Sequence, residues 1–272
     1  MSTRPDALVI DGLTIKFGGV TALDDVSFSV AAGSLTALIG PNGAGKTSCF
    51  NCLSGIYRPT AGAISVAGRD VTGLSQHRIA RLGLSRTFQS PALFGGLTVL
   101  ENLMTGRFRH GRGGMVAGML RLPNVIKDEV RQRERVEAIL ELLEISHLRN
   151  AAVDDLSYGF QKRVELGRAL AADPSILLLD EPMAGMTVDE KEDMSAFILA
   201  SREELGNTVL LIEHDMGVVM DLAEHVVVLD FGRKIGDGTP DEVRGNEAVV
   251  AAYLGAEAVP EETETVLQGG DR

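Results

Sequence analysis

Alternating apolar and polar residues at the start of the chain predict two strands. The runs 8–17 and 22–30 are rich in Val, Ile and Phe, and the turn residues Gly18 and Gly19 separate them, which is typical of an antiparallel hairpin. A short apolar run, Leu35–Ile39, then leads through a glycine-rich loop into a helical pattern that begins near Lys46. The chain is therefore expected to open with a hairpin and to continue as strand, loop and helix.

Strand and helix patterns alternate in the second half of the chain. Apolar strands are expected at 176–179, Thr208–Ile212 and 226–229, and helical periodicity covers 125–143 and 190–205. Such alternation predicts an α/β fold with a parallel sheet flanked by helices. No repeat of fixed period is found along the chain, so we expect one folded unit.

Composition excludes several classes of protein. The 272 residues are 44% apolar, which is enough for a real core, and the net charge of -12 argues against a nucleic acid partner. No apolar run is long enough to cross a bilayer and the N-terminus has no signal-peptide core, so we expect a cytoplasmic chain. Cys49 and Cys52 form a Cys-x-x-Cys pair without a second pair, and we assign them no chemistry.

A glycine-rich loop after the third expected strand carries the first chemical motif. The segment 40–47 fits a phosphate loop, in which backbone N–H groups wrap phosphates at a helix N-terminus. Lys46 would reach the β- and γ-phosphates, and Thr47 would bind Mg²⁺. The residues expected to bind the nucleotide here are Gly40, Asn42, Gly43, Gly45, Lys46, Thr47 and Ser48.

The strand at 176–179 ends in two carboxylates, Asp180 and Glu181. A buried strand with a polar end is the commoner case, but together with the phosphate loop the pair indicates a nucleotide-hydrolysing site. Asp180 would help to hold Mg²⁺, and Glu181 would polarise the attacking water. These motifs alone leave a kinase, a GTPase or a motor protein open.

The segment between the two motifs narrows the class. Residues 156–163, Leu-Ser-Tyr-Gly-Phe-Gln-Lys-Arg, are similar to the signature sequence of ATP-binding cassette (ABC) proteins. The resemblance runs from about residue 8 to residue 255. It implies a phosphate-loop NTPase cassette with a mixed sheet core, an N-terminal antiparallel β subdomain and an α-helical signature subdomain.

The resemblance also implies roles for residues that would be ordinary polar or apolar residues on their own. Gln89 is similar to the glutamine of the family's Q-loop, which is catalytic and touches the metal, and His214 is similar to its catalytic switch histidine. Phe17 matches the position of an adenine-stacking ring. Ser157 and Gly159 would face the γ-phosphate held by a second cassette, so that ATP would join two cassettes and hydrolysis would part them.

Three residues depart from the commonest family pattern. Tyr158 replaces a glycine, Phe160 replaces a glutamine, and Thr187 stands where the D-loop usually has Asp or Asn. Phe160 and Thr187 leave the rate of hydrolysis and the coupling between cassettes open, while Ser157 and Gly159 are intact.

Further segments resemble the cassettes of branched-chain amino acid importers, in particular the longer of two cassette subunits. They include Arg86-Thr87-Phe88-Gln89, residues 97–103, Tyr158 in the signature, and Ala252-Tyr253-Leu254-Gly255. The resemblance implies ATP and Mg²⁺ as cofactors, and as partners a second cassette, two permeases and, indirectly, a periplasmic or extracellular binding protein. The chain would sit peripherally on the cytoplasmic face of the membrane.

Other functions stay open at this point. The group includes importers of urea, short amides and other small solutes, and the sequence cannot name the solute. A lipopolysaccharide-export ATPase, a soluble ABC ATPase outside transport, and a cassette that binds nucleotide without hydrolysing it are the remaining alternatives.

The expected domain organisation is one cassette over 1–256 and a disordered acidic tail over 257–272. The helical part would cover about 90–172 and contain an insertion at about 105–127. The insertion is basic within an acidic protein, which suggests contact with the permease or with anionic lipid headgroups, although a solvated loop would look the same. Its basic residues are Arg107, Arg109, His110, Arg112, Arg121 and Lys127.

Overall fold

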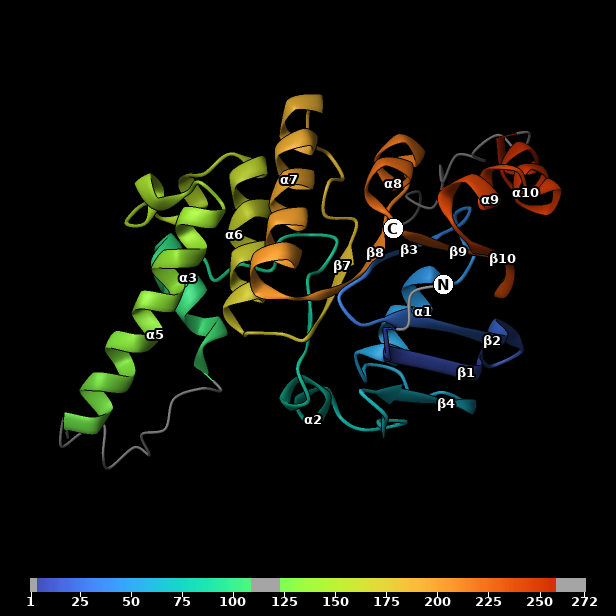
Figure 1. The fold of residues 1–272 in the computed structure, drawn as a ribbon, viewed down its shortest axis with the longest axis horizontal. Helices are drawn as coiled ribbons and strands as arrows, with labels where there is room; N and C mark the ends of the chain where they lie inside the picture. The colour runs from blue at the N-terminus through green and yellow to red at the C-terminus, as the bar shows by residue number, and fades with distance from the viewer. Residues whose placement is uncertain (1–3, 109–122, 258–272) are drawn as a thin grey trace, which may run out of the picture.

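The computed structural model describes residues 4–108 and 123–257. Within them the strands form two sheets (Figure 1). The N-terminal sheet has the order β2-β1-β4-β5, with antiparallel pairing throughout. Its strands are β1 (Asp6–Phe17), β2 (Val20–Ala31), β4 (Ala61–Val66) and β5 (Arg69–Asp70).

The second sheet has six strands in the order β10-β9-β3-β8-β7-β6. All neighbouring strands are parallel except β10, which pairs antiparallel with β9. The sheet is therefore mixed, and the edge strand β10 is the exception to the parallel sheet expected from the alternation. Its strands are β3 (Leu35–Ile39), β6 (Leu84–Arg86), β7 (Ile176–Asp180), β8 (Thr208–Ile212), β9 (His225–Asp230) and β10 (Arg233–Gly238).

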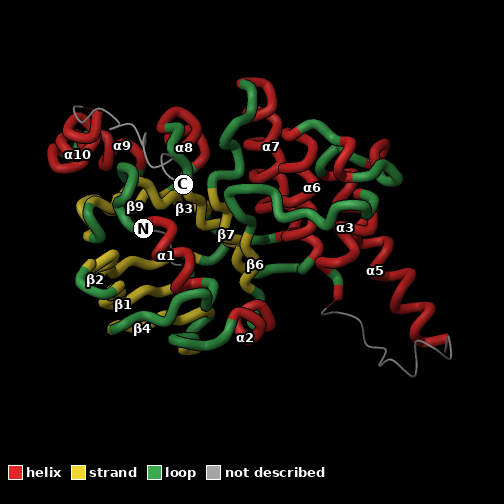
Figure 2. The backbone as a smooth tube through the Cα atoms, turned by 180° about the vertical axis from the view of Figure 1, so that it is seen from behind, coloured by secondary structure: helices red, strands yellow, loops and turns green. Residues whose placement is uncertain are grey.

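Helices cover both faces of the six-stranded sheet. Helix α1 lies between the two sheets, while α3, α5 and α6 gather at the end of the molecule far from the antiparallel sheet (Figures 1 and 2). The helices are α1 (Lys46–Leu53), α2 (Gln76–Arg81), α3 (Val99–Gly106), α5 (Pro123–Leu142), α6 (Tyr158–Ala171), α7 (Val188–Leu205), α8 (Met216–Leu222), α9 (Pro240–Arg244) and α10 (Glu247–Glu257), with short 3₁₀ turns at Ser146–Leu148 and Val153–Asp155.

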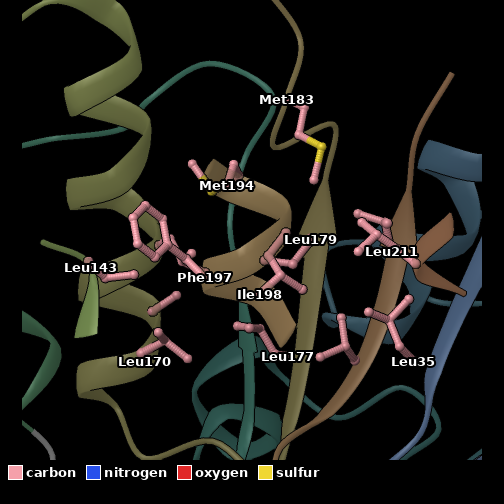
Figure 3. Packing of buried hydrophobic residues seen from close by; sticks show 14 of the residues in the cluster. Leu35, Leu143, Leu170, Leu177, Leu179, Met183, Met194, Phe197, Ile198 and Leu211 are labelled. Carbon is pink, nitrogen blue, oxygen red and sulfur yellow. The ribbon is translucent and has the colours of Figure 1, made fainter. Parts of the chain in front are cut away.

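The central strands are buried on both faces, which is why they read as unbroken apolar runs. In β7, Leu177 and Leu179 pack toward the helices and Leu178 packs toward α1 and the antiparallel sheet. Figure 3 shows Leu177 and Leu179 beside Ile198 of α7. The strands are thus packed on both faces, and the candidate functional residues come directly after the strand ends.

Some sequence expectations are corrected or fall outside the described residues. Arg107 does not join an exposed basic cluster, because its side chain is buried and donates to Gln132 (2.6 Å), to the carbonyl of Ala171 (2.7 Å) and to Asp173. Lys127 is exposed. The other basic residues of the insertion and the tail after Glu257 lie outside the described residues. No helix in the described part of the chain is long and apolar enough to span a membrane.

Candidate nucleotide-binding site

The phosphate loop joins the end of β3 to the start of α1. Gly40 has φ 147° and Gly45, the N-cap of α1, has φ 102°, a backbone region that favours glycine. A Cβ on Gly40 would lie 2.0 Å from the carbonyl oxygen of Leu229, and one on Gly45 would lie 2.6 Å from that of Ala22. Glycine is therefore required at both positions by close approach of the neighbouring strands.

Lys46 is already held across the loop. Its ammonium donates to the carbonyls of Gly40 (2.6 Å) and Pro41 (3.0 Å). Burial lowers the pKa of Lys46, while the nearby carboxylates of Glu181 and Asp180 act to raise it. The cation thus lies within electrostatic reach of both acidic residues and of the loop that would hold phosphates.

A cleft of about 650 Å³ opens over the loop. Its walls come from the start of β2, the phosphate loop, the ends of the parallel strands and the β9–β10 turn. The lining residues are Val20, Thr21, Ala22, Asn42, Gly43, Ala44, Gly45, Lys46, Thr47, Ser48, Gln89, Glu181, His214, Phe231 and Gly232. Every phosphate-loop residue expected to bind nucleotide lines the cleft except Gly40, which is buried.

Glu181 is the centre of the polar side of the cleft. Its Oε2 accepts from Nε2 of Gln89 (2.8 Å), and its Oε1 lies 2.6 Å from Nε2 of His214. These residues follow β6, β7 and β8, which are neighbouring parallel strands that end at the same edge of the sheet. The three residues expected to be catalytic beside Lys46 are therefore brought together.

Two buried charged residues support this cluster, and sequence reasoning assigned neither of them a role. Glu213 accepts from the backbone N–H groups of Met183 (2.9 Å) and His214 (3.2 Å), and burial raises its pKa. Lys162 of α6 donates to the carbonyls of Gln89 (2.5 Å) and Glu181 (3.3 Å), and burial lowers its pKa. The sequence offered one indication of their importance: Lys162 lies in the signature sequence, and Glu213 directly precedes His214.

Comparison with known proteins agrees with this geometry. A family model described as ABC transporter matches residues 23–184, and one described as branched-chain amino acid ATP-binding cassette transporter matches residues 233–259. The chain belongs to the ABC transporter family. Its match to the high-affinity branched-chain amino acid transport ATP-binding protein BraF of Pseudomonas aeruginosa has 42% identity and covers 93% of this chain and 99% of that protein.

Two more ABC relatives cover nearly all of the cassette. The high-affinity branched-chain amino acid transport ATP-binding protein LivG of Escherichia coli is 38% identical over 91% of this chain and 97% of its own length. A crystal structure of the ADP conformation of an ATP-binding cassette of an ABC transporter has a TM-score of 0.81 at 32% identity, and the match covers 93% of this chain and 100% of that one. The expected fold, a phosphate-loop ABC cassette, is thereby confirmed.

The residues expected to hold Mg²⁺ suit that ion. Thr47 and Gln89 line the cleft, and Asp180 is the last residue of β7 and close enough to Lys46 to affect its pKa. Mg²⁺ prefers oxygen ligands and is usually bound by one or two protein groups together with water and substrate phosphates. Within the described residues no cluster of three acidic, His or Cys side chains could hold a metal alone. A metal that arrives with the nucleotide fits this set.

The signature residues do not reach the cleft of their own cassette. Ser157 is exposed at the N-cap of α6, and neither it nor Gly159 lines the cleft. Gly159 is buried against α7, where a Cβ would lie 2.2 Å from Oε1 of Glu190. An action on a second cassette, as the resemblance implies, is compatible with this position.

Packing explains two of the departures from the common pattern. Thr187 caps α7, since its hydroxyl accepts from the N–H of Glu190 and the Glu190 carboxylate accepts from the N–H of Thr187. Phe160 lies against the guanidinium of Arg163 at 5.2 Å and edge-on to His147 at 6.1 Å. Both residues thus make local contacts within the cassette.

Two aromatic residues concern the base-binding end of the site, Phe17 and Phe231. Phe17 is 45% exposed and packs edge-on against Tyr57, with ring centroids 5.0 Å apart, but it does not line the cleft. Phe231, in the β9–β10 turn, does line it and is 86% exposed. Sequence reasoning missed Phe231, because a lone aromatic residue after a strand carries no signal by itself.

Cys49 and Cys52 are buried thiols without a disulfide. Burial raises the pKa of both, that of Cys52 to about 11. Neither forms a reactive thiolate near neutral pH, which agrees with the absence of an assigned role.

Proposed function

We propose that this chain is the ATP-hydrolysing subunit of an ABC importer for branched-chain amino acids. The observation that carries the hydrolytic part is the Gln89–Glu181–His214 cluster facing the phosphate loop across one cleft. The substrate class is supported by the names of BraF and LivG and by the family model matched at 233–259. Urea, amides and other small solutes stay as alternatives for the transported compound.

The cleft residues divide the chemistry of hydrolysis between them. Lys46 and the N–H groups of the phosphate loop would stabilise the charge on the β- and γ-phosphates. Mg²⁺, held through Thr47, Gln89 and Asp180, would neutralise the charge that develops on the phosphates. Glu181 would orient the attacking water and accept its hydrogen bond.

Gln89 and His214 hold both oxygens of the Glu181 carboxylate, so the proposal gives them a positioning role at the reacting water. His214 would also contact the γ-phosphate. Phe17 keeps its proposed role as the adenine contact, which would require the base to extend beyond the residues that line the cleft.

The proposal includes two kinds of partner, a second cassette and two transmembrane permeases. A second cassette would bring Ser157 and Gly159 onto the γ-phosphate, which is consistent with their distance from their own cleft. Two transmembrane permeases would bind the pair on the cytoplasmic face of the membrane. A cassette over 1–256 with a helical part at about 90–172 is the corresponding domain organisation.

Replacing Glu181 with Gln tests the hydrolytic assignment. Glu181→Gln should bind ATP as the wild type does but lose turnover by a factor of about 100 or more, because the amide is a poor acceptor for the proton of water. The same change at Glu203, an exposed residue of α7, is the matched control and should leave turnover unchanged. Hydrolysis near the wild-type rate in Glu181→Gln would remove Glu181 from this role.

Replacing Lys46 with Ala tests the phosphate loop separately. Lys46→Ala should lose both affinity for ATP and hydrolysis, because a cation against the phosphates disappears. Equilibrium binding of ATP to the purified variant is the measurement. An unchanged affinity would contradict the assignment of the loop.

Uptake by whole cells tests the substrate class. A strain deleted for this chain should take up less labelled leucine, isoleucine and valine, and the wild-type gene should restore uptake while Glu181→Gln should not. Unchanged uptake of all three, with loss of urea or amide uptake, would favour the alternative solutes.

A further inference from the structure

Arg86, the last residue of β6, is a buried cation at the edge of the proposed metal site. Its Nη2 donates to Oδ2 of Asp180 at 2.7 Å, and both side chains are almost fully buried, 6% and 5% exposed. Its Nη1 donates to Asn51 (2.8 Å) and Ser54 (2.9 Å), both at the C-terminal end of the phosphate-loop helix α1. One guanidinium therefore joins β6, the end of β7 and α1.

Aromatic rings enclose the same guanidinium. The ring of Phe88 lies 5.2 Å from Cζ and that of Phe50 lies 5.6 Å from it, so the charge is screened little by water. Nε is buried and has no hydrogen-bond partner among the residues that the structure describes. A buried ion pair with an unsatisfied donor is poorly explained by fold stability, because desolvation offsets most of the attraction.

The charge of Arg86 at this position should weaken the binding of Mg²⁺ to Asp180. Asp180 is the carboxylate proposed to hold Mg²⁺, and a positive group on one of its oxygens competes with the metal for the same charge. The arrangement has an advantage only when the metal is away, since an unpaired carboxylate buried to this extent is strongly unfavourable. Arginine suits that task because it does not lose its proton.

We propose that Arg86 is the resident counter-cation of Asp180: it neutralises and orients the carboxylate while no metal and nucleotide are bound, and it raises the Mg²⁺ concentration that the site requires. By holding Oδ2 alone, it leaves Oδ1 for the metal. The inference rests on the proposed role of Asp180 as a magnesium ligand. Arg86 is thus a positioning residue that acts through Asp180.

The test follows thermal unfolding of the full chain with saturating ADP while Mg²⁺ is titrated, so that no turnover is needed. Arg86→Met should melt at a lower temperature without metal. The Mg²⁺ midpoint, which is the Mg²⁺ concentration that gives half of the metal-dependent rise in melting temperature, should be about tenfold lower in Arg86→Met than in the wild type. This change corresponds to removing one partly screened unit charge a few ångströms from the metal. Arg86→Lys keeps the charge and should keep the wild-type midpoint.

Arg107→Met is the matched control. Arg107 is also buried, donates to three acceptors and pairs with an aspartate, but that aspartate is Asp173 and not a cleft residue. This variant should melt earlier with an unchanged Mg²⁺ midpoint. If it shifted the midpoint as Arg86→Met does, the effect would be one of general destabilisation and the inference would be overturned.

Three results separate the inference from the function on which it rests. A wild type whose ADP-induced stabilisation does not depend on Mg²⁺ would overturn the magnesium role of Asp180. A dependent wild type with an unchanged or raised midpoint in Arg86→Met would overturn only the role of Arg86. If Arg86→Met does not fold, Arg86→Gln decides, because it keeps a donor and removes only the charge: a lowered Mg²⁺ midpoint supports the role of Arg86, and an unchanged midpoint overturns it.

Discussion

Lys162 offers a sharp test of how the signature helix is tied to the hydrolytic cluster. Lys162 is 2% exposed, and its ammonium donates to the backbone carbonyls of Gln89 and Glu181, the two residues whose side chains are hydrogen-bonded to each other in the cleft. The ring of Tyr158 lies 5.7 Å from the same nitrogen. Replacing Lys162 with Met keeps an unbranched chain of nearly the same length and removes the donors and the charge.

The size of the effect can be worked from these contacts. Two partly buried carbonyls would lose a partner, at a cost of about 1–3 kcal/mol each, and removing a buried charge would offset part of that cost. The free energy of unfolding should therefore fall by about 2 kcal/mol. Because Lys162 does not line the cleft, affinity for ATP should change little, whereas kcat should fall about tenfold as Gln89 and Glu181 lose their fixed spacing.

Urea unfolding, equilibrium ATP binding and steady-state hydrolysis of Lys162→Met together give the three quantities. Lys234→Met, which removes a half-exposed lysine paired with Asp237, is the control and should change none of them by a large amount. A stability loss with unchanged kcat would refute the reasoning and leave Lys162 a purely structural residue.

Three further predictions concern the walls of the cleft. Gly40→Ala should lower the free energy of unfolding by at least about 3 kcal/mol in urea, because its Cβ would meet a backbone carbonyl that cannot move away; a stable variant would contradict the loop geometry. Phe231→Ala should weaken ADP binding about tenfold in calorimetry, because its exposed ring lines the cleft and would add a nucleotide contact to the one proposed for Phe17; an unchanged affinity would contradict a contact with Phe231. Burial raises the pKa of Glu213 above its unfolded value of 4.5, so the contribution of Glu213 to stability is complete below pH 4.5 and is lost as the pH rises through the folded pKa. The free energy of unfolding of the wild type should therefore rise relative to that of Glu213→Gln as the pH falls from neutral. A difference that stays constant with pH would contradict this prediction.

Local patterns predicted the strands that are buried on both faces. The runs at β3 and β8 match their observed bounds, and β7 differs by one residue. Short or mixed strands carried no comparable signal: β6 has three residues, and β10 contains two glycines. Their existence depends on pairing with distant strands rather than on local periodicity.

The phosphate loop and the Gln89–Glu181–His214 cluster were predictable because each lies at the end of a strand in a recognisable motif. Arg86 and Lys162 were not assigned roles. Their partners are up to 94 residues away in the sequence, and a lone basic residue in a motif does not reveal whether it is buried. Arg107 illustrates the same difficulty of predicting burial from sequence. It was grouped with the basic residues of the insertion, but it is buried and pairs with Asp173.

The most direct test of the account is what this chain binds in the membrane. Tagged Glu181→Gln protein should be purified from detergent-solubilised membranes with ATP present, which should hold cassettes together without turnover, and its partners should be identified by mass spectrometry. We predict two multi-span permeases together with a second, shorter cassette. Recovery of soluble partners alone would contradict the assignment as an importer subunit and would favour an ABC ATPase that works outside transport.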